Sequence, residues 1–199
     1  MVVICFKHSS ERSGEENVIK ALLKIIGEEI TGYYGAAFRF LDASHLIPLS
    51  IMTALFPTFT KLHLSSVANL KKLYFKILAI MLIIAIPVTL VLFFGAEQII
   101  QILYGRQYTQ SANVLKILSF TTIFMFLHVP GAHLLFASEK ILKKVIVLSF
   151  FTVGFNILGN LILIPKYSLI GASFMTVASE GFSFVVFYLL IWFKFFKNK

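Results

Sequence analysis

The sequence predicts an all-α polytopic membrane protein, a bundle of about five transmembrane helices. Its composition and its long apolar runs predict this class. Of the 199 residues, 58% are hydrophobic and only 14% are charged, whereas soluble globular domains average about half apolar and about a quarter charged. With 22 phenylalanines, the chain has too few polar groups to cover its apolar area in water. We therefore expect lipid to surround most of it.

The apolar runs indicate where the helices lie. A helix needs about 20 predominantly apolar residues to cross a hydrocarbon core of about 30 Å. A fifth run, residues 32–58, is less uniform than the other four, and we predict that it crosses the membrane as well. Its interruptions are Arg39, Asp42 and His45. The four uninterrupted runs are residues 73–94, 117–136, 145–164 and 169–193.

The distribution of lysines predicts the orientation. Cytoplasmic loops carry an excess of Lys and Arg. Segments 59–72 and 137–144 and the C-terminal tail hold three lysines each, whereas the connections 95–111 and 165–168 hold one basic residue each. We therefore expect a multi-pass protein of the cytoplasmic (inner) membrane with its C-terminus in the cytoplasm. The net charge of +9 then follows from topology and does not indicate nucleic-acid binding.

The N-terminal segment, residues 1–31, differs from the transmembrane bundle predicted over residues 32–199. It carries nine charged residues, and its apolar start, residues 1–6, is six residues long. A secretory signal peptide needs a basic n-region and an apolar stretch of about 7 to 15 residues. We expect this segment to be a truncation remnant and the chain to be the C-terminal part of a longer membrane protein.

Polar residues near the middle of the spans are the candidate functional residues. At 1.5 Å per residue, Asp42, His128, Asn156 and Glu180 all lie about 15 to 16 Å from one face of the membrane. Such residues are costly in lipid and mark transport pathways. Because four of the five predicted helices share this layer, we expect a central aqueous cavity, as in transporters whose site lies at the midplane.

Two of these groups have structural alternatives within their own helices. Arg39, Asp42 and His45 are spaced i, i+3, i+6, so a local ion pair on one face is the alternative to lining a cavity. Asn156 and Asn160, at i, i+4, are also typical of hydrogen bonds that join transmembrane helices.

The remaining ionisable residues differ in their possible partners. His128 and His133 flank Pro130, so satisfying the carbonyls that the proline frees is their structural alternative. Glu180 has no basic residue within one turn of its own helix. We expect it to be protonated, hydrated or paired with another helix, and its candidate partners are Arg39 and a residue upstream of this chain.

Catalytic and metal-binding signatures are absent from the sequence. It contains no H-E-x-x-H, G-x-x-x-x-G-K-[ST] or G-x-S-x-G motif. Its single cysteine, Cys5, excludes a disulfide framework and a Cys-based zinc site. We expect a protein that is not an enzyme and that uses no cofactor and no metal. A membrane-embedded enzyme is the less favoured class.

Several motifs carry a family resemblance. The sequence GYYGAAFRF at 32–40, followed by Ile47-Pro48 and Leu55-Phe56-Pro57, resembles the GYY-x-A-x-R…P…LFP helix of the polysaccharide biosynthesis flippases of the MOP (MATE-like) superfamily. Further matches follow in order at residues 97–108, 156–165 and 171–180.

The resemblance implies half of a MATE-like transporter that works by alternating access. It implies transport of a lipid-linked oligosaccharide, a polyprenyl-pyrophosphate glycan of the kind used for lipopolysaccharide O-antigen, across the cytoplasmic membrane. The implied partners are this glycan lipid, membrane lipids and a complementing N-terminal half. A multidrug or cation antiporter of the same superfamily, or a truncated product, is the alternative.

The resemblance also implies roles for the polar residues. Arg39 would contact the phosphates, because a guanidinium matches their oxygens with a planar fork. The other cavity residues would hydrate the glycan or sense a coupling proton or cation. These are Asp42, His45, His128, Asn156, Asn160 and Glu180.

Overall fold

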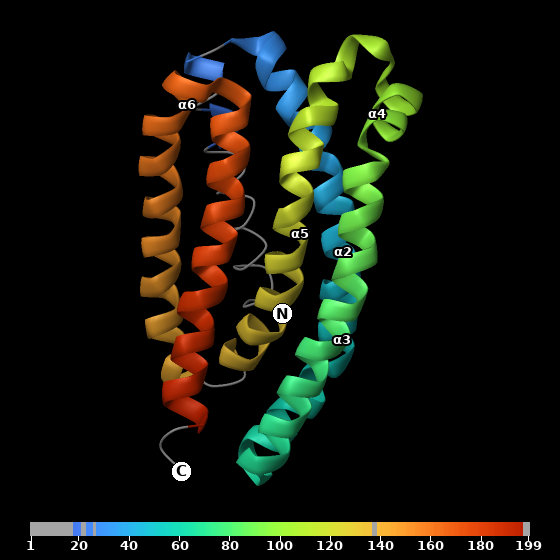
Figure 1. Ribbon diagram of the computed structural model, residues 1–199. Coiled ribbons are helices and arrows are strands. Elements are labelled where there is room, and N and C mark those ends of the chain that lie inside the picture. The colour runs from blue at the N-terminus through green and yellow to red at the C-terminus, as the bar shows by residue number, and fades with distance from the viewer. Residues whose placement is uncertain (1–17, 21–22, 26, 137–138, 197–199) are drawn as a thin grey trace.

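The computed structural model describes residues 18–20, 23–25, 27–136 and 139–196. Its principal elements over these residues are five α-helices, with a 3₁₀ turn at Arg106–Tyr108 and a π-helical turn at Trp192–Phe196 (Figure 1). The helices are α2 (Glu28–Ser65), α3 (Val67–Phe94), α4 (Ala96–Tyr104), α5 (Thr109–Phe136) and α6 (Glu139–Ile191).

Helix α6 is two antiparallel arms, residues 139–167 and 169–191, which reverse direction at Ser168 and lie side by side (Figure 1). Ser168 has φ 52° and ψ −130°. These angles lie outside the helical range, so the helix is interrupted at this residue. Gly171 permits this tight reversal, because a Cβ there would lie 2.5 Å from the backbone oxygen of Leu163 in the first arm.

Within the described residues, four helices are long and apolar enough to cross a membrane, and the last of them contains both arms of α6. The predicted run 32–58 lies within α2, and the run 117–136 lies within α5. The all-α polytopic bundle predicted from the sequence is confirmed. The helices extend past the predicted runs because polar residues at a membrane surface continue a helix as readily as apolar ones.

The connections alternate between the two ends of the bundle (Figure 1). The turn between α2 and α3, the start of α6 and the end of its second arm lie together at the lower end (Figure 1). Most lysines of the described residues lie in or next to these segments. The bend at Ser168 and helix α4 lie at the upper end. The lysine-rich segments that the sequence groups on one side therefore share one end of the molecule, which we call the lysine end.

Helix α5 is the centre of the bundle. It packs against α2, α3, α4 and α6 and buries residues on all its sides. By contrast, α3 exposes large apolar side chains such as Ile83, Val91 and Phe94 along its outer surface. Such an apolar surface suits a helix that faces lipid or forms part of the outer shell of the bundle.

The predicted connection 95–111 is more ordered than a simple loop, because it contains α4. Gly105, with φ 86°, ends α4 in a backbone conformation that glycine adopts without strain. At its start, the Lys116 ammonium on α5 donates a hydrogen bond to Glu97 Oε1. This ion pair connects α4 with the upper end of α5.

Candidate functional site

Amide and hydroxyl groups join the two arms of α6. Asn156 Nδ2, on the first arm, donates to Ser179 Oγ on the second arm at 2.9 Å. Asn160 Nδ2 donates to the backbone oxygen of Asn156 at 2.9 Å and to its Oδ1 at 3.0 Å. Both asparagines thus belong to one hydrogen-bonded group that links the arms, which is the arrangement typical of polar residues between membrane helices.

Glu180, next to Ser179, faces α5. Its Oε2 lies 3.8 Å from Nδ1 of His128, and the side chains are 29% and 10% exposed. Of the three states expected for Glu180, the structure shows a contact with another helix, but the contact is not with the candidate Arg39. The partner is His128, whose orientation toward the second arm depends on how the two helices are rotated against each other.

The His128 ring is held on its other side by an aromatic contact. Its centroid lies 4.7 Å from that of Phe187, with the planes at 76°. Phe187 and Glu180 are seven residues apart on the second arm, so both project from the same face of the helix. These two residues therefore fix the imidazole in place.

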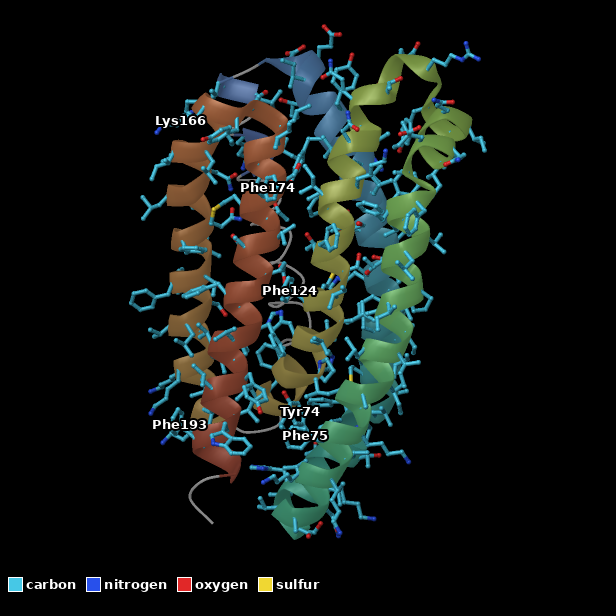
Figure 2. The ribbon with its side chains drawn as sticks, in the orientation of Figure 1. Tyr74, Phe75, Phe124, Lys166, Phe174 and Phe193 are labelled. Carbon is cyan, nitrogen blue, oxygen red and sulfur yellow. The ribbon has the colours of Figure 1, made fainter. Side chains whose placement is uncertain are left out.

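This group lies near the middle of the bundle. A Cβ on Gly181, next to Glu180, would lie 3.6 Å from Cε1 of Phe124 on α5. Figure 2 shows Phe124 at about the middle height of the bundle. We call Asn156, Asn160, His128, Ser179 and Glu180 the central polar group. The structure thus brings together three of the four residues that the sequence assigned to one depth.

His133 lies outside the central polar group. Its Nδ1 is 3.0 Å from the backbone oxygen of Val129, and its ring packs against Phe56 of α2 with a centroid distance of 6.2 Å. Because a proline removes the hydrogen bond to the carbonyl four residues earlier, the carbonyl that Pro130 frees is that of Phe126. The His133 ring therefore contacts the carbonyl of Val129 and not the carbonyl that Pro130 frees.

The polar residues of α2 form a second group. Arg39 and Asp42 are exposed and His45 is half-buried. Arg39 makes no ion pair or hydrogen bond with any other described residue, so a local pair between Arg39 and Asp42 is not formed. The buried stripe of α2 contains Leu41 and Ser44, and both charged residues lie outside this stripe.

A buried hydrogen bond connects the helix that carries Arg39 with the arm that carries Glu180. Tyr34 Oη lies 2.8 Å from Thr176 Oγ1. Tyr34 is fully buried, and Thr176 precedes Glu180 by one helical turn. This hydrogen bond therefore joins the helix of the second polar group to the arm that carries part of the central polar group.

Sequence reasoning missed Tyr34, Thr176 and Ser179. The signal that could have found them is a polar stripe along an otherwise apolar helix. The stripe recurs every three or four residues, so it marks one helical face. Its members, all buried, are Ser173, Thr176, Ser179 and Ser183.

The chemistry of these residues suits binding rather than covalent catalysis. The central polar group offers amides, a hydroxyl, an imidazole and a carboxylate, which can hydrogen-bond hydroxyl-rich molecules or hold a proton. Among the residues that the structure describes, no three His, Cys, Asp or Glu side chains gather into a possible metal site.

Outside the membrane-spanning helices, one electrostatic effect is clear. The hydrogen bond from Lys116, and then its positive charge, lower the pKa of the Glu97 carboxyl. Glu97 belongs to α4, at the upper end of the bundle.

The fold defines a class: a multi-pass helical membrane protein. Within this class, the sequence model of the family described as "Lipid II flippase MurJ" matches residues 24–195. The chain belongs to this family of lipid-linked flippases. The resemblance to flippases of the MOP superfamily is thereby confirmed in its broader form.

A relative of known sequence is much longer than this chain. An uncharacterized membrane protein of Methanocaldococcus jannaschii is 30% identical over 120 residues, which is 59% of this chain and 22% of the relative. The match therefore spans less than a quarter of the relative's length. No solved structure matches the chain.

Proposed function

We propose that the chain forms part of a flippase that carries a lipid-linked oligosaccharide, a polyprenyl-pyrophosphate glycan, across the cytoplasmic membrane for surface polysaccharide biosynthesis. Membership of a lipid-linked flippase family supports the transport activity. The choice of an anionic, sugar-bearing substrate is supported by the two polar groups described above.

The observation that carries the proposal is the exposed position of Arg39 and Asp42 on α2. Each lies more than ten residues from either end of the helix. A charge at the centre of a membrane helix costs about 2.5 to 3.5 kcal/mol when it faces hydrocarbon. This face of α2 is therefore suited to a water-filled cavity or to another part of the transporter.

Within such a cavity, Arg39 is the anion-binding residue. Its guanidinium presents two parallel N–H groups that match the oxygens of a pyrophosphate. It has no carboxylate partner among the described residues that would compete with the substrate. Asp42 and His45, on the same helix, would contact sugar hydroxyls.

The central polar group would bind the glycan part of the substrate. Asn156, Asn160, His128 and Glu180 offer hydrogen-bond donors and acceptors at mid-depth, where a glycan needs replacements for its water shell. The lysine end faces the cytoplasm in this proposal, in agreement with the excess of lysine on cytoplasmic loops. A complementing N-terminal half would close the other side of the cavity.

Binding of the carrier lipid tests the proposal. The full chain is purified in lipid nanodiscs, and its affinity for polyprenyl pyrophosphate is compared with that for the neutral polyprenol. Because hydrogen bonds to charged groups contribute about 1.5 to 3 kcal/mol, Arg39→Gln should weaken pyrophosphate binding about 10- to 100-fold. Arg39→Lys, which keeps the charge without the fork, should restore part of it.

A matched control is Thr53→Ala, which removes an exposed polar side chain farther along α2 whose hydroxyl donates to the Leu49 carbonyl of its own helix. It should bind like the natural chain. Equal affinity of Arg39→Gln and the natural chain, or equal affinity for the charged and neutral lipids, would contradict the proposal.

A further inference from the structure

Helix α4 carries an exposed apolar face at the upper end of the bundle (Figure 1). Ile102 and Leu103 are 80% and 63% exposed, although isoleucine and leucine are among the residues most often buried in proteins. Both lie three or four residues from Ile99, so the three side chains share one face of the helix. A different face packs against the bundle, and it contains the buried Ala96 and Ile100.

The polar residues of α4 lie roughly opposite this exposed apolar face. At about 100° per residue, Glu97, Gln98 and Gln101 fall on one side of the helix. All three are exposed. A helix that exposes one polar and one apolar face is typical of segments that lie in the plane of a membrane surface, with the apolar side toward the acyl chains.

The position of α4 along the bundle matches the edge of a hydrocarbon core. On α3, the exposed Lys76 and the last helical residue, Phe94, are 18 positions apart. This is about 27 Å at 1.5 Å per residue, close to the core thickness of about 30 Å. Helix α4 begins two residues after Phe94. On α5, Lys116, which pairs with Glu97, directly precedes the apolar run 117–136.

The exposed face of α4 follows directly on the outer surface of α3. Phe94 is 71% exposed, and Val91, on the same last turn, is exposed as well. Only Gly95 separates the two helices. Because α3 is long and apolar enough to cross a membrane, the lipid around its last turn would also contact Ile102 and Leu103.

Aromatic and basic side chains surround α4 at the same end of the bundle. The ring centroid of Tyr104 lies 5.3 Å from that of Tyr108 and 6.3 Å from that of Phe40 on α2, and Tyr108 lies 5.5 Å from Tyr33. Tyrosines are enriched where a membrane meets water. Arg106, in the turn after α4, is exposed, and its guanidinium makes no ion pair or hydrogen bond with another described residue.

We propose that α4 lies in the membrane surface at the upper end of the bundle and that its partner is phospholipid. The acyl chains cover Ile102 and Leu103, and the Arg106 guanidinium binds a lipid phosphate with its planar fork. The ion pair between Glu97 and Lys116 connects the helix with α5. In the orientation proposed above, the lipid belongs to the outer leaflet.

Spin labels on the two faces of α4 test this proposal. The full chain, in a Cys5→Ser background, carries a single label at Ile102→Cys or Leu103→Cys and is placed in phosphatidylcholine nanodiscs. Relaxation of the label is measured with oxygen, which concentrates in hydrocarbon, and with a nickel chelate, which stays in water. Oxygen should relax both labels more strongly than the chelate. A label at Gln98→Cys, the matched control on the polar face, should show the reverse.

The same measurement gives the depth of α4. A label at Ile83→Cys, near the middle of α3 and exposed, should show a higher ratio of oxygen to chelate relaxation than the labels at Ile102 and Leu103. These two labels should in turn show a higher ratio than one at Thr109→Cys, at the start of α5. This order is expected for a helix at the boundary between acyl chains and water.

A charge on the apolar face should displace α4 toward water. With the label at Leu103→Cys, Ile102→Asp should shift relaxation from oxygen toward the chelate. Gln98→Asp adds the same charge to the polar face, so it should leave the ratio unchanged. Arg106→Gln should produce a smaller shift than Ile102→Asp, because the apolar contacts remain, and Arg106→Lys should reverse part of it.

Three results would overturn the proposal. Stronger relaxation by the chelate at Ile102 and Leu103 would place this face in water. Weak relaxation by both reagents would show that a protein segment or a second copy covers it, and a depth equal to that of Ile83 would place α4 inside the hydrocarbon. If Ile102→Asp does not fold, the labels in the otherwise natural chain still decide. The experiment uses no flippase substrate, so its failure leaves Arg39-dependent binding unaffected.

Discussion

Tyr34 Oη and Thr176 Oγ1 lie 2.8 Å apart although 142 residues separate them in the chain. Thr176 Oγ1 is also 3.0 Å from the carbonyl oxygen of Ala172, to which it donates. The tyrosine hydroxyl is therefore the donor in the first bond. Because this bond joins α2 to the second arm of α6, it links the helix that carries Arg39 with the helix that carries Glu180.

This arrangement predicts unequal effects for the two obvious substitutions. Tyr34→Phe removes the donor and leaves Thr176 bonded to its own helix, so the loss of stability should be about 0.5 to 1.5 kcal/mol. Thr176→Val removes the acceptor that Thr176 provides for the buried Tyr34 hydroxyl, and a buried donor that loses its acceptor costs about 1 to 3 kcal/mol. Unfolding in mixed micelles measures both. A larger effect for Tyr34→Phe would contradict the assigned donor.

The bend in α6 predicts a stabilising substitution. Ser168 adopts φ 52° and ψ −130°, a conformation that costs a residue with a Cβ about 1 to 3 kcal/mol. Glycine adopts it without that strain. Ser168→Gly should therefore raise the midpoint of thermal unfolding, whereas Ser168→Val should lower it. A lower midpoint for the glycine variant would show that the serine side chain stabilises the bend.

The alternation of lysine-rich and lysine-poor connections predicts which sites an external reagent can reach. Single cysteines are placed in a Cys5→Ser background at Ser66, between α2 and α3, and at Thr109, at the start of α5. In intact cells, an impermeant thiol reagent should label the cysteine at Thr109 and spare the one at Ser66. Permeabilised cells, in which both should react, are the control. The reverse pattern in intact cells would invert the proposed orientation.

Acid should weaken the attachment of α4. The Lys116 hydrogen bond and charge lower the pKa of Glu97 below its ordinary value of 4.5. A carboxyl whose pKa is lower in the folded state contributes stability above the ordinary value, and this contribution disappears as the pH falls through the lowered one. Because Glu97 is exposed, we expect a small effect.

The measurement is the thermal midpoint between about pH 6 and pH 3. The natural chain should lose more stability over this range than Glu97→Gln, which has no carboxyl to protonate. Identical pH profiles for the two proteins would show that the pair contributes nothing to the fold.

The sequence was sufficient for the architecture because hydrocarbon imposes its requirements residue by residue. An uninterrupted apolar run such as 73–94 lies within a helix, and the depth of Asn156 and Glu180 follows from the fixed rise of that helix. The fold therefore follows from local pattern and from the thickness of the membrane.

Which polar residues pair with one another inside the bundle could not be predicted from the sequence in the same way. Glu180 meets His128 and not Arg39, because the partner depends on the rotation of α5 against α6, which many apolar contacts determine together. Similarly, the spacing of Arg39 and Asp42 permits an ion pair that the structure does not form between them. A helical spacing shows which residues can meet, whereas packing decides which of them do.

Movement of the glycan lipid tests the central claim most directly. The gene is expressed from its own locus, so that any longer product is included, in a strain depleted of its resident flippase. The appearance of polyprenyl-pyrophosphate glycan on the outer face is followed by labelling of its sugars. We expect outward movement with the natural gene, none with Arg39→Gln, and natural rates with Thr53→Ala at equal protein levels. Outward movement that is equally fast with Arg39→Gln, or no faster with the natural gene than without it, would contradict the account.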